Sequence, residues 1–346
     1  MAADVKSMTL EELQAFLAEW GEPKFRAKQI FAWLHEKQVD DFSQMTNLSQ
    51  ALRQRLAAET SISRLQMVER LLSKQDGTRK YLFALENGSV IESVLMQYEY
   101  GNTVCVSTQA GCRMGCRFCA STLDGVERSL TTGEMLSQVY TIQKDLGERI
   151  SGVVLMGSGE PLDNYDAVLR FIRLLNDPAG QNIGQRHITL STCGLVENMY
   201  RLADEALQIT LAVSLHAPND TIRQQIMPVA NAYPMEQLLQ ACQDYIQKTK
   251  RRITFEYAMM QGINDSDVCA EELAQKLRHM LCHVNLIPMN PVKEREFTKS
   301  GTERVQHFAK ILQQHGVETT IRRRLGSDID AACGQLRRRY MQKEER

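Results

Sequence analysis

One stretch of the sequence decides the fold: VCVSTQAGCRMGCRFC, residues 104–119. Its first residues are apolar and β-branched and predict a buried strand, which the CxxxCxxC motif of Cys112, Cys116 and Cys119 follows directly. Three thiolates at this spacing can each hold one corner of a cubane iron–sulfur cluster, which leaves one iron open to bind a substrate. Two alternatives are a zinc site that lacks its fourth ligand and three buried free cysteines. Zinc sites usually show a second CxxC or a paired histidine, and the sequence has neither.

Downstream of this stretch, short β-branched runs alternate with segments of helical periodicity. Strands that alternate with helices pair in parallel through right-handed crossovers. Six such runs are too few to close an eight-stranded barrel, so we predict an α/β fold, a partial (βα)6 TIM-like barrel. In such folds the chemistry gathers at the carboxyl ends of the strands. The predicted strands are residues 104–107, 153–156, 188–191, 209–215, 253–257 and 284–287.

Upstream of the motif, the pattern changes from helices to strands. Residues 9–57 show short apolar helical faces separated by polar linkers. Two apolar runs around Asn87-Gly88 are typical of a β-hairpin. We therefore expect four parts: a helical N-terminal accessory domain (1–75), a β-hairpin extension (76–100), the barrel with a C-terminal loop (101–338) and a charged tail (339–346).

The composition excludes several classes of protein. Net charge is -1 from 41 basic and 42 acidic residues, so the chain as a whole is no polyelectrolyte partner for nucleic acid. No run of 18 apolar residues occurs, and the N-terminus lacks the basic-then-apolar layout of a secretion signal. We therefore expect a cytoplasmic protein with no membrane contact. Disulfides are rare in that compartment, so clustered members of the nine cysteines indicate metal binding or catalysis.

The cysteine motif, with Phe118 just before its last cysteine, resembles the signature of the radical S-adenosylmethionine superfamily. The resemblance implies one [4Fe–4S] cluster per chain on Cys112, Cys116 and Cys119. It also implies S-adenosylmethionine at the open iron, cleaved there to a 5′-deoxyadenosyl radical. The segment MGSGEP (156–161) resembles the glycine-rich segment that receives the methionyl amino group, and polar residues follow at later strand ends. The implied S-adenosylmethionine contacts are Gly159, Glu160, Ser191, Ser214, Leu215, His216 and Asn290.

Two further segments, CVSTQAGC (105–112) and DIDAACGQL (328–336), resemble the RlmN/Cfr family of RNA adenine methyltransferases. The resemblance implies that Cys333 accepts a methyl group from one S-adenosylmethionine, and that a radical formed from a second molecule takes a hydrogen from this methyl. The methylene radical then adds to adenine. Cys105 releases the adduct by forming a disulfide bond with Cys333, which must then be reduced. Glu92 matches the family's proton acceptor.

These assignments have simpler alternatives. A single carboxylate such as Glu92 carries little signal and could be a surface residue of the hairpin. Cys105 and Cys333 could be ordinary buried thiols. Cys193 departs from the residues expected in the family, and packing is its favoured interpretation.

Residues 285–290 and 320–323 resemble the RlmN branch, which makes 2-methyladenosine, more than the Cfr branch, which makes 8-methyladenosine. The resemblance implies an enzyme that methylates C2 of adenosine 2503 in 23S rRNA and of adenosine 37 in some tRNAs. Such an enzyme consumes two S-adenosylmethionine molecules per methyl group. We further expect an electron donor of the flavodoxin or ferredoxin type and a monomeric state.

Three basic runs are candidates for RNA contact. Residues 322–324 and 337–339 are arginines that bracket Cys333 in the sequence, and a third run lies at 248–252. Such runs would guide an RNA by contacting its phosphates, although a solvated surface is the usual meaning of a charge run. An adenine in a folded RNA must leave its stack to reach a buried radical, so the enzyme has to hold the RNA around it. We expect the helical N-terminal domain to do this. A different radical enzyme and a noncatalytic RNA adaptor with zinc-binding cysteines remain alternative functions.

Overall fold

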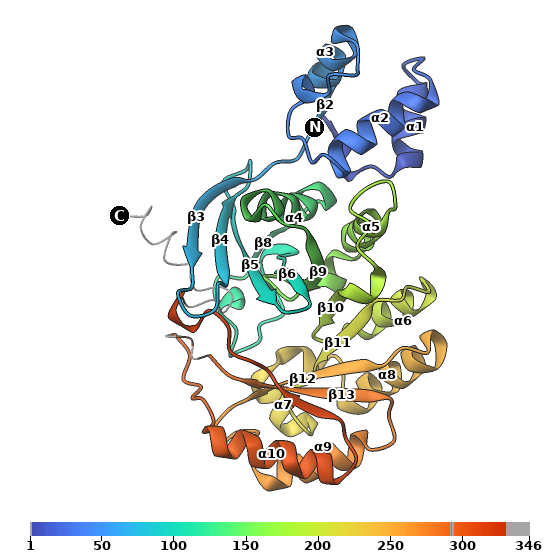
Figure 1. The fold of residues 1–346 in the computed structure, drawn as a ribbon. Coiled ribbons are helices and arrows are strands. Elements are labelled where there is room, and N and C mark those ends of the chain that lie inside the picture. The colour runs from blue at the N-terminus through green and yellow to red at the C-terminus, as the bar shows by residue number, and fades with distance from the viewer. Residues whose placement is uncertain (1, 291, 293, 330–346) are drawn as a thin grey trace.

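The computed structural model describes residues 2–290, 292 and 294–329. Cys333, the basic run 337–339 and the expected tail 339–346 lie outside these residues. The described chain is built around one ten-stranded sheet, which Figure 1 shows from the side. In spatial order its strands are β14 (Thr319–Ile321), β13 (Cys282–Pro288), β12 (Ile253–Met259), β11 (Thr210–Ser214), β10 (Ile188–Thr192), β9 (Ile150–Leu155), β6 (Gly101–Cys105), β5 (Val90–Tyr98), β4 (Arg79–Ala84) and β3 (Gln66–Leu72).

The predicted partial barrel is confirmed. All six predicted strands are present, as β6 and β9 to β13, and each is parallel to its neighbours in this set. β14 adds a parallel strand that the sequence analysis missed, because only one of its three residues is apolar. On the other side of β6, the strands β5, β4 and β3 continue the sheet in antiparallel pairing. β3 lies inside the range 1–75, which we assigned to the helical N-terminal domain, although it pairs with β4 in the main sheet.

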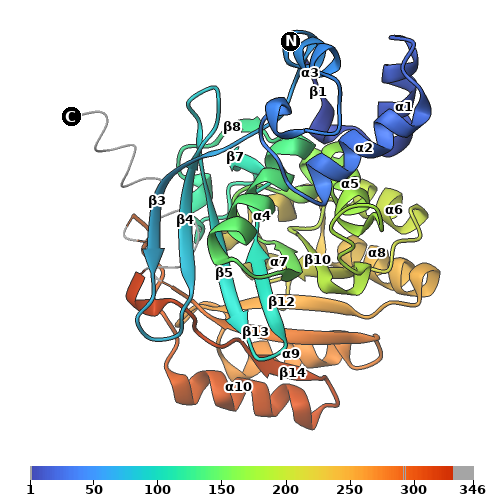
Figure 2. The same cartoon turned by 45° about the horizontal axis from the view of Figure 1, so that its top comes forward.

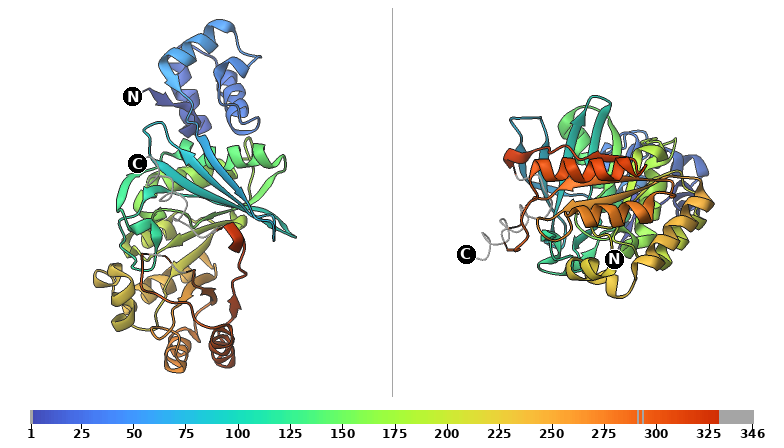
Figure 3. Two further views of the ribbon diagram at one scale, coloured as in Figure 1. Left: turned by 90° about the vertical axis from the view of Figure 1, so that its left-hand side faces the viewer. Right: turned by 90° about the horizontal axis from the view of Figure 1, so that it is seen from below.

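Helices cover the outside of the parallel strands, as Figures 1 and 3 show. The strand side chains alternate accordingly: Val104, Val153 and Leu155 join the main core. Cys105 and Val154, which alternate with them, belong to a separate cluster on the inside of the sheet. The helices are α4 (Thr132–Leu146), α5 (Tyr165–Asn176), α6 (Val196–Asp204), α7 (Asp220–Ile226), α8 (Met235–Thr249), α9 (Asp267–Leu277) and α10 (Thr302–Gln314).

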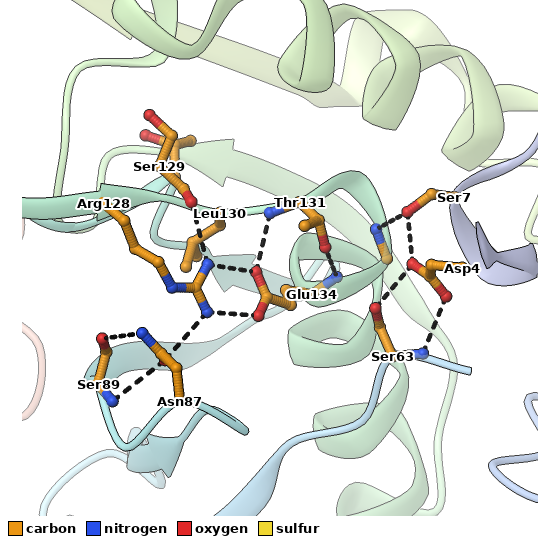
Figure 4. Close-up of polar contacts among 12 residues, drawn as sticks. Asp4, Ser7, Ser63, Asn87, Ser89, Arg128, Ser129, Leu130, Thr131 and Glu134 are labelled. Atoms are coloured by element: carbon orange, nitrogen blue, oxygen red, sulfur yellow. Dashed lines mark hydrogen bonds and ion pairs between the residues drawn. The ribbon is translucent and has the colours of Figure 1, made fainter. Parts of the chain in front are cut away.

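Helix α4 is the crossover between the first two parallel strands, and its start is well defined. The hydroxyl of Thr131 accepts a hydrogen bond from the amide of Glu134, whose carboxylate accepts one in return from the amide of Thr131. The same carboxylate pairs with Arg128, as Figure 4 shows. Gly147, at φ +75°, ends the helix. α4 is therefore a fixed support for the strands beside it.

A small helical module precedes the sheet and stands at one end of it (Figures 1 and 2). Its core is formed by apolar residues of all three of its helices, and its two short strands pair in parallel. The elements are β1 (Ala3–Asp4), α1 (Leu10–Ala18), α2 (Lys24–His35), α3 (Gln50–Glu59) and β2 (Thr60–Ser61).

Polar contacts tie this module to the first turn of α4. Ser7 Oγ accepts a 2.8 Å hydrogen bond from the amide of Gly133 and donates one of 2.6 Å to Asp4 (Figure 4). Asp4 also accepts hydrogen bonds from the amide and hydroxyl of Ser63. Lys6 is fully buried at the same junction. No described helix is long and apolar enough to cross a membrane.

Candidate functional site

The cysteine motif lies on a loop whose start is fixed by the backbone. The loop leaves β7 (Gln109–Gly111), which pairs with β8 (Val126–Ser129). The amide of Cys112 donates a 2.8 Å hydrogen bond to the carbonyl oxygen of Gly125. Gly111 has φ +80°, and a Cβ there would meet that same oxygen at 2.1 Å. Glycine at this position therefore lets the two backbones approach closely enough to hold the first cysteine.

The three thiols of the motif are close enough to act on one another. Cys112 is buried, and Cys116 and Cys119 are half-buried. Burial raises the pKa of Cys112 to about 12, and Cys119 contributes to the increase. The pKa of Cys116 is raised by burial and by both other thiols. Crowded thiols with a raised pKa are held as thiolates when a bound cation takes up their charge.

This donor set fits an iron–sulfur cluster. Among residues 2–290, 292 and 294–329, no three His, Cys, Asp or Glu side chains converge on the position of a single metal ion. A cubane does not need such convergence, because each thiolate binds a different iron. Cys112, Cys116 and Cys119 are the residues that would hold the cluster.

The glycine-rich segment packs directly on the strand that leads into the cysteine motif. The amide of Gly157 donates to the carbonyl oxygen of Val106 at 3.0 Å, and a Cβ on Gly157 would meet that oxygen at 2.6 Å. Gly159 has φ +103°, and a Cβ there would lie 2.6 Å from the Cβ of Gln109. These contacts leave no room for side chains at the two glycines, so glycine is needed there for the segment to pack on residues 106–109.

The carboxylate of Glu160 is buried between two strand ends. Its Oε1 accepts a hydrogen bond from the amide of Leu162 at 3.0 Å, and its Oε2 accepts one from the amide of Cys193 at 2.8 Å. Burial raises the pKa of Glu160, and the two amide hydrogen bonds oppose the increase. The side chain thus links the ends of β9 and β10. Its contact with S-adenosylmethionine stays a prediction.

His216, just after β11, is buried next to the cysteine motif. Its Nδ1 accepts a 2.9 Å hydrogen bond from the amide of Ala258, which places the proton of the neutral ring on Nε2. Burial lowers the pKa of His216 to about 3, and the charge of Arg223 contributes. The ring meets Phe118 edge-on, with centroids 4.9 Å apart. A neutral imidazole therefore connects the end of β11 to the residue that precedes Cys119.

Arg223 of α7 is a fully buried cation surrounded by backbone oxygens. Its Nη2 donates to the carbonyl oxygen of Cys193 at 2.7 Å, and its Nε donates to that of Leu215 at 3.3 Å. Longer hydrogen bonds of 3.4 Å reach the carbonyl oxygens of Ser214 and Tyr233. One guanidinium therefore fixes the carbonyl groups at the ends of β10 and β11.

The other predicted cofactor contacts also lie at strand ends. Ser191 in β10 and Ser214 in β11 are half-buried on neighbouring strands, and Leu215 is buried. Asn290 follows β13 and is exposed, and its Oδ1 accepts a 3.0 Å hydrogen bond from Arg324. The structure thus brings the β10 and β11 residues together, whereas Asn290 lies at the far side of the parallel strands.

Cys105 and Glu92 lie on adjacent strands and face the inside of the sheet. Cys105 is paired in register with Val94, so Glu92 lies two residues further along β5 on the same face. Glu92 is 4% exposed, and its Oε2 lies 3.1 Å from Nζ of the fully buried Lys80. Glu92 is therefore no surface residue of the hairpin. Cys333 lies outside the described residues.

Sequence reasoning missed the side chains that support this site. Gln138 of α4 accepts hydrogen bonds of 2.8 Å from the amide of Ser107 and from the hydroxyl of Ser93. Neither Gln138 nor Arg223 stands in a recognisable motif, because their partners are distant along the chain. Lys80 gave no signal either, because it follows Arg79 directly and stands before the apolar run 81–85.

Cys193 is buried in a small apolar cluster that Met114, Cys116 and Phe118 contact. Burial raises the pKa of Cys193 well above its usual value, and Glu160 adds to the increase. These contacts agree with packing as its role.

The chain is similar to known proteins over nearly its full length. Residues 3–62 match the family described as ribosomal RNA large subunit methyltransferase N-terminal domain, and residues 106–274 match the radical SAM superfamily. A relative from Lachnoclostridium phytofermentans, named probable dual-specificity RNA methyltransferase RlmN, is 55% identical over 98% of this chain and 96% of its own length. A relative of the same name from Clostridium novyi is 54% identical over 98% of both chains.

A solved structure agrees with these relatives. A radical SAM methyltransferase from Sphaerobacter thermophilus is 45% identical and superposes with a TM-score of 0.92, over 96% of this chain and 98% of that one. The superfamily match implies S-adenosylmethionine and a 4Fe–4S cluster as cofactors. From the identity over nearly the whole chain, the common fold and the cysteine motif on the loop that follows its first parallel strand, we conclude that the chain belongs to the RlmN family of radical SAM RNA methyltransferases.

Proposed function

We propose that this protein methylates C2 of adenosine, at adenosine 2503 of 23S rRNA and at adenosine 37 of some tRNAs. The observation that carries the proposal is the position of Glu92, a buried carboxylate two residues beyond the partner of Cys105 on the same inner face. A reaction that replaces the hydrogen on C2 by a methyl group needs a proton acceptor and a thiol in one enclosed place. The names of the relatives support RNA as the substrate.

In this proposal the strand ends hold the cofactors. Cys112, Cys116 and Cys119 bind the [4Fe–4S] cluster, which when bound supplies the electron that cleaves S-adenosylmethionine. Gly157 and Gly159 pack closely on residues 106–109, which fixes the backbone of the glycine-rich segment beside the cysteine motif. The proposed S-adenosylmethionine contacts are Gly159, Glu160, Ser191, Ser214, Leu215, His216 and Asn290.

Two cysteines and one carboxylate handle the methyl group. The thiol of Cys333 loses its proton and takes a methyl group from one S-adenosylmethionine, and a second molecule is consumed when a hydrogen is removed from that methyl. The resulting carbon radical joins C2 of adenine, and Glu92 accepts the proton that C2 gives up. The adduct also gives up one electron, which the oxidised cluster would take back. The thiolate of Cys105 then attacks the sulfur of Cys333, which forms a disulfide bond and breaks the bond from that sulfur to the methylene carbon on the base. The released methylene carbon takes up a proton, such as the one held by Glu92, and becomes the methyl group.

The remaining parts of the chain complete the proposal. The helical module that precedes β3 grips RNA, the antiparallel strands β3 to β5 form the extension that carries Glu92, and the barrel holds the cofactors. The exposed Arg323 and Arg324 supply phosphate contacts. A reductant of the flavodoxin or ferredoxin type restores the cluster and the thiols, and the enzyme acts as a cytoplasmic monomer.

The test uses protein reconstituted anaerobically with iron and sulfide. It is incubated with S-adenosylmethionine, a reductant and either a 23S rRNA fragment or tRNA, and the nucleosides are identified by mass spectrometry. We expect 2-methyladenosine from both RNAs, and 8-methyladenosine would contradict the proposal. Cys105→Ala should accumulate a covalent RNA–protein adduct, because nothing releases the base. Cys282→Ala, a change at a buried cysteine on β13, should release its product normally.

A further inference from the structure

The turn between β3 and β4 binds a segment that is more than 250 residues away in the sequence. The carboxylate of Asp328 accepts a 2.6 Å hydrogen bond from the hydroxyl of Ser73 and one of 2.9 Å from the amide of Lys74. These two hydrogen bonds hold the pKa of Asp328 below its usual range, so the carboxylate is ionised at neutral pH. Hydrogen bonds to an ionised acceptor are stronger than those between neutral groups.

Two more hydrogen bonds join the same two segments, and in these the turn accepts and residues 326–327 donate. The carboxylate of Asp76, in the turn, accepts a 2.8 Å hydrogen bond from the amide of Gly326. The hydroxyl of Ser327 donates one of 2.9 Å to the side chain of Gln75. Figure 1 shows the contact, where the chain after β14 meets the lower end of the β3–β4 hairpin. We name the contact between residues 73–76 and residues 326–328 the clasp.

The turn is shaped before the other segment binds. Asp76 Oδ1 accepts a 3.0 Å hydrogen bond from the amide of Thr78, and Gly77 has φ +74°. The hydroxyl of Ser73 accepts a hydrogen bond from the amide of Gln75 at 3.2 Å. A turn ordered in this way loses little conformational freedom when residues 326–328 dock on it.

The clasp lies next to Cys105 and limits the reach of the chain that follows it. Leu325 packs against the cluster of Val94, Met96 and Cys105. Cys333 follows Asp328 by five residues (333 − 328), and it follows Ile321, the last residue of β14, by twelve (333 − 321). At about 3.5 Å per extended residue, anchoring at Asp328 shortens the maximal tether from about 42 Å to about 18 Å. A shorter tether raises the effective concentration of one thiol near the other.

We propose that the clasp is a positioning device that keeps the C-terminal segment docked beside Cys105, so that the thiols of Cys333 and Cys105 meet often. The proposal rests on the proposed function, in which both thiols act on one methyl group. Ser73, Asp76 and Asp328 are therefore positioning residues, because they act through the segment that they hold. Opening the clasp lowers the fraction of molecules that are competent for transfer, which reduces kcat by the same factor and leaves the KM for RNA unchanged.

The test compares the reconstituted wild type with Asp328→Asn, Ser73→Ala and Ser73→Thr. The matched control is Glu86→Gln, an exposed residue in the neighbouring β4–β5 turn. For Asp328→Asn and Ser73→Ala we expect kcat for 2-methyladenosine formation to fall about tenfold, the worth of one hydrogen bond to a charged group. The KM for RNA should stay within about twofold. Ser73→Thr keeps the hydroxyl and should retain the wild-type rate, as should Glu86→Gln.

A second measurement keeps the clasp testable if the RNA reaction itself fails. In reduced, cluster-free protein, glutathione disulfide of fixed concentration oxidises Cys105 and Cys333 to a disulfide bond while it is itself reduced to two glutathione molecules. The rate of bond formation, followed by mass spectrometry, should fall about tenfold in Asp328→Asn, because the longer tether lowers the effective concentration. If wild-type protein makes no 2-methyladenosine, the proposed function fails, and this rate alone decides on the clasp. Unchanged kcat or an unchanged rate of disulfide formation in Asp328→Asn would overturn the inference.

Discussion

Ser107 Oγ donates a 2.7 Å hydrogen bond to the backbone carbonyl oxygen of Glu92. The same oxygen atom of Ser107 accepts a 2.9 Å hydrogen bond from the amide of Ser158. The side chain of Gln138 holds the backbone of Ser107. Its Oε1 accepts a 2.8 Å hydrogen bond from the amide of Ser107, and its Nε2 donates one of 2.9 Å to the carbonyl oxygen of Ser107. One buried hydroxyl therefore joins the strand of the proposed proton acceptor to the glycine-rich segment.

Removing this hydroxyl should destabilise the protein. Ser107→Ala leaves two buried backbone groups without their partner, and we expect a loss of about 1–3 kcal/mol in the free energy of unfolding, measured with urea. The control is Ser151→Ala, at a half-buried hydroxyl that donates one 3.1 Å hydrogen bond to Asn102. Its loss should stay below about 1 kcal/mol. Equal losses in the two variants would contradict a joining role for Ser107.

Arg223 should matter for both stability and cofactor binding. Arg223→Met leaves the carbonyl oxygens at the ends of β10 and β11 without a donor, so we expect a loss of at least about 2 kcal/mol in urea denaturation. S-adenosylmethionine should also bind more weakly, as measured by calorimetry on reconstituted protein, because Ser214 and Leu215 lose their fixed orientation. Arg278→Met, at an exposed arginine, is the control and should change neither quantity. Wild-type affinity in Arg223→Met would show that these carbonyl groups need no such support.

Two buried histidines should make stability depend on pH. Burial lowers the pKa of His35 and of His216 to about 3 each, and the charges of Lys6 and Arg223 contribute respectively. In the unfolded chain a histidine titrates near about 6.5. Between these values the unfolded chain binds protons that the folded chain excludes. The free energy of unfolding should therefore fall as the pH drops below about 6.5. Each histidine contributes up to about 1.4 kcal/mol per pH unit.

Urea denaturation of the cluster-free protein from about pH 4 to 8 measures this slope. His216→Asn should make the slope smaller, because one of the buried neutral histidines is gone. Asparagine suits the site, since His216 has φ +56° and asparagine tolerates the left-handed region. A wild-type stability that is independent of pH in this range would contradict neutral burial of both rings.

The barrel could be predicted from the sequence because its strands are local, β-branched runs such as residues 253–257, which form most of β12. The cysteine motif was equally local. β14 was not predictable, since Thr319 and Thr320 carry no apolar pattern and pair only because β13 lies beside them. Ser107 and Gln138 are 31 residues apart, so only the folded chain shows that they bind each other. Site residues whose partners are distant in the sequence therefore cannot be predicted from local sequence patterns.

The buried ion pair of Lys80 and Glu92 allows the chemical role of the carboxylate to be separated from its structural role. Their charged atoms are 3.1 Å apart, and the side chains are 0% and 5% exposed. Lys80→Met should cost about 3–5 kcal/mol in urea denaturation, because the carboxylate stays buried after losing its cation. The half-exposed pair of Lys276 and Glu272 is the control, and Lys276→Met should cost about 0.5 kcal/mol or less.

Adding Glu92→Gln to Lys80→Met should restore much of the lost stability, because a neutral amide needs no buried cation. If Glu92 is the proton acceptor, this double variant folds stably and still fails to make 2-methyladenosine. Glu92→Gln would then raise the stability of the Lys80→Met variant and still abolish methylation. A purely structural role for Glu92 would not separate stability from activity in this way. A double variant that is less stable than Lys80→Met alone would contradict the pairing, and one that methylates RNA at the wild-type rate would remove Glu92 from the reaction.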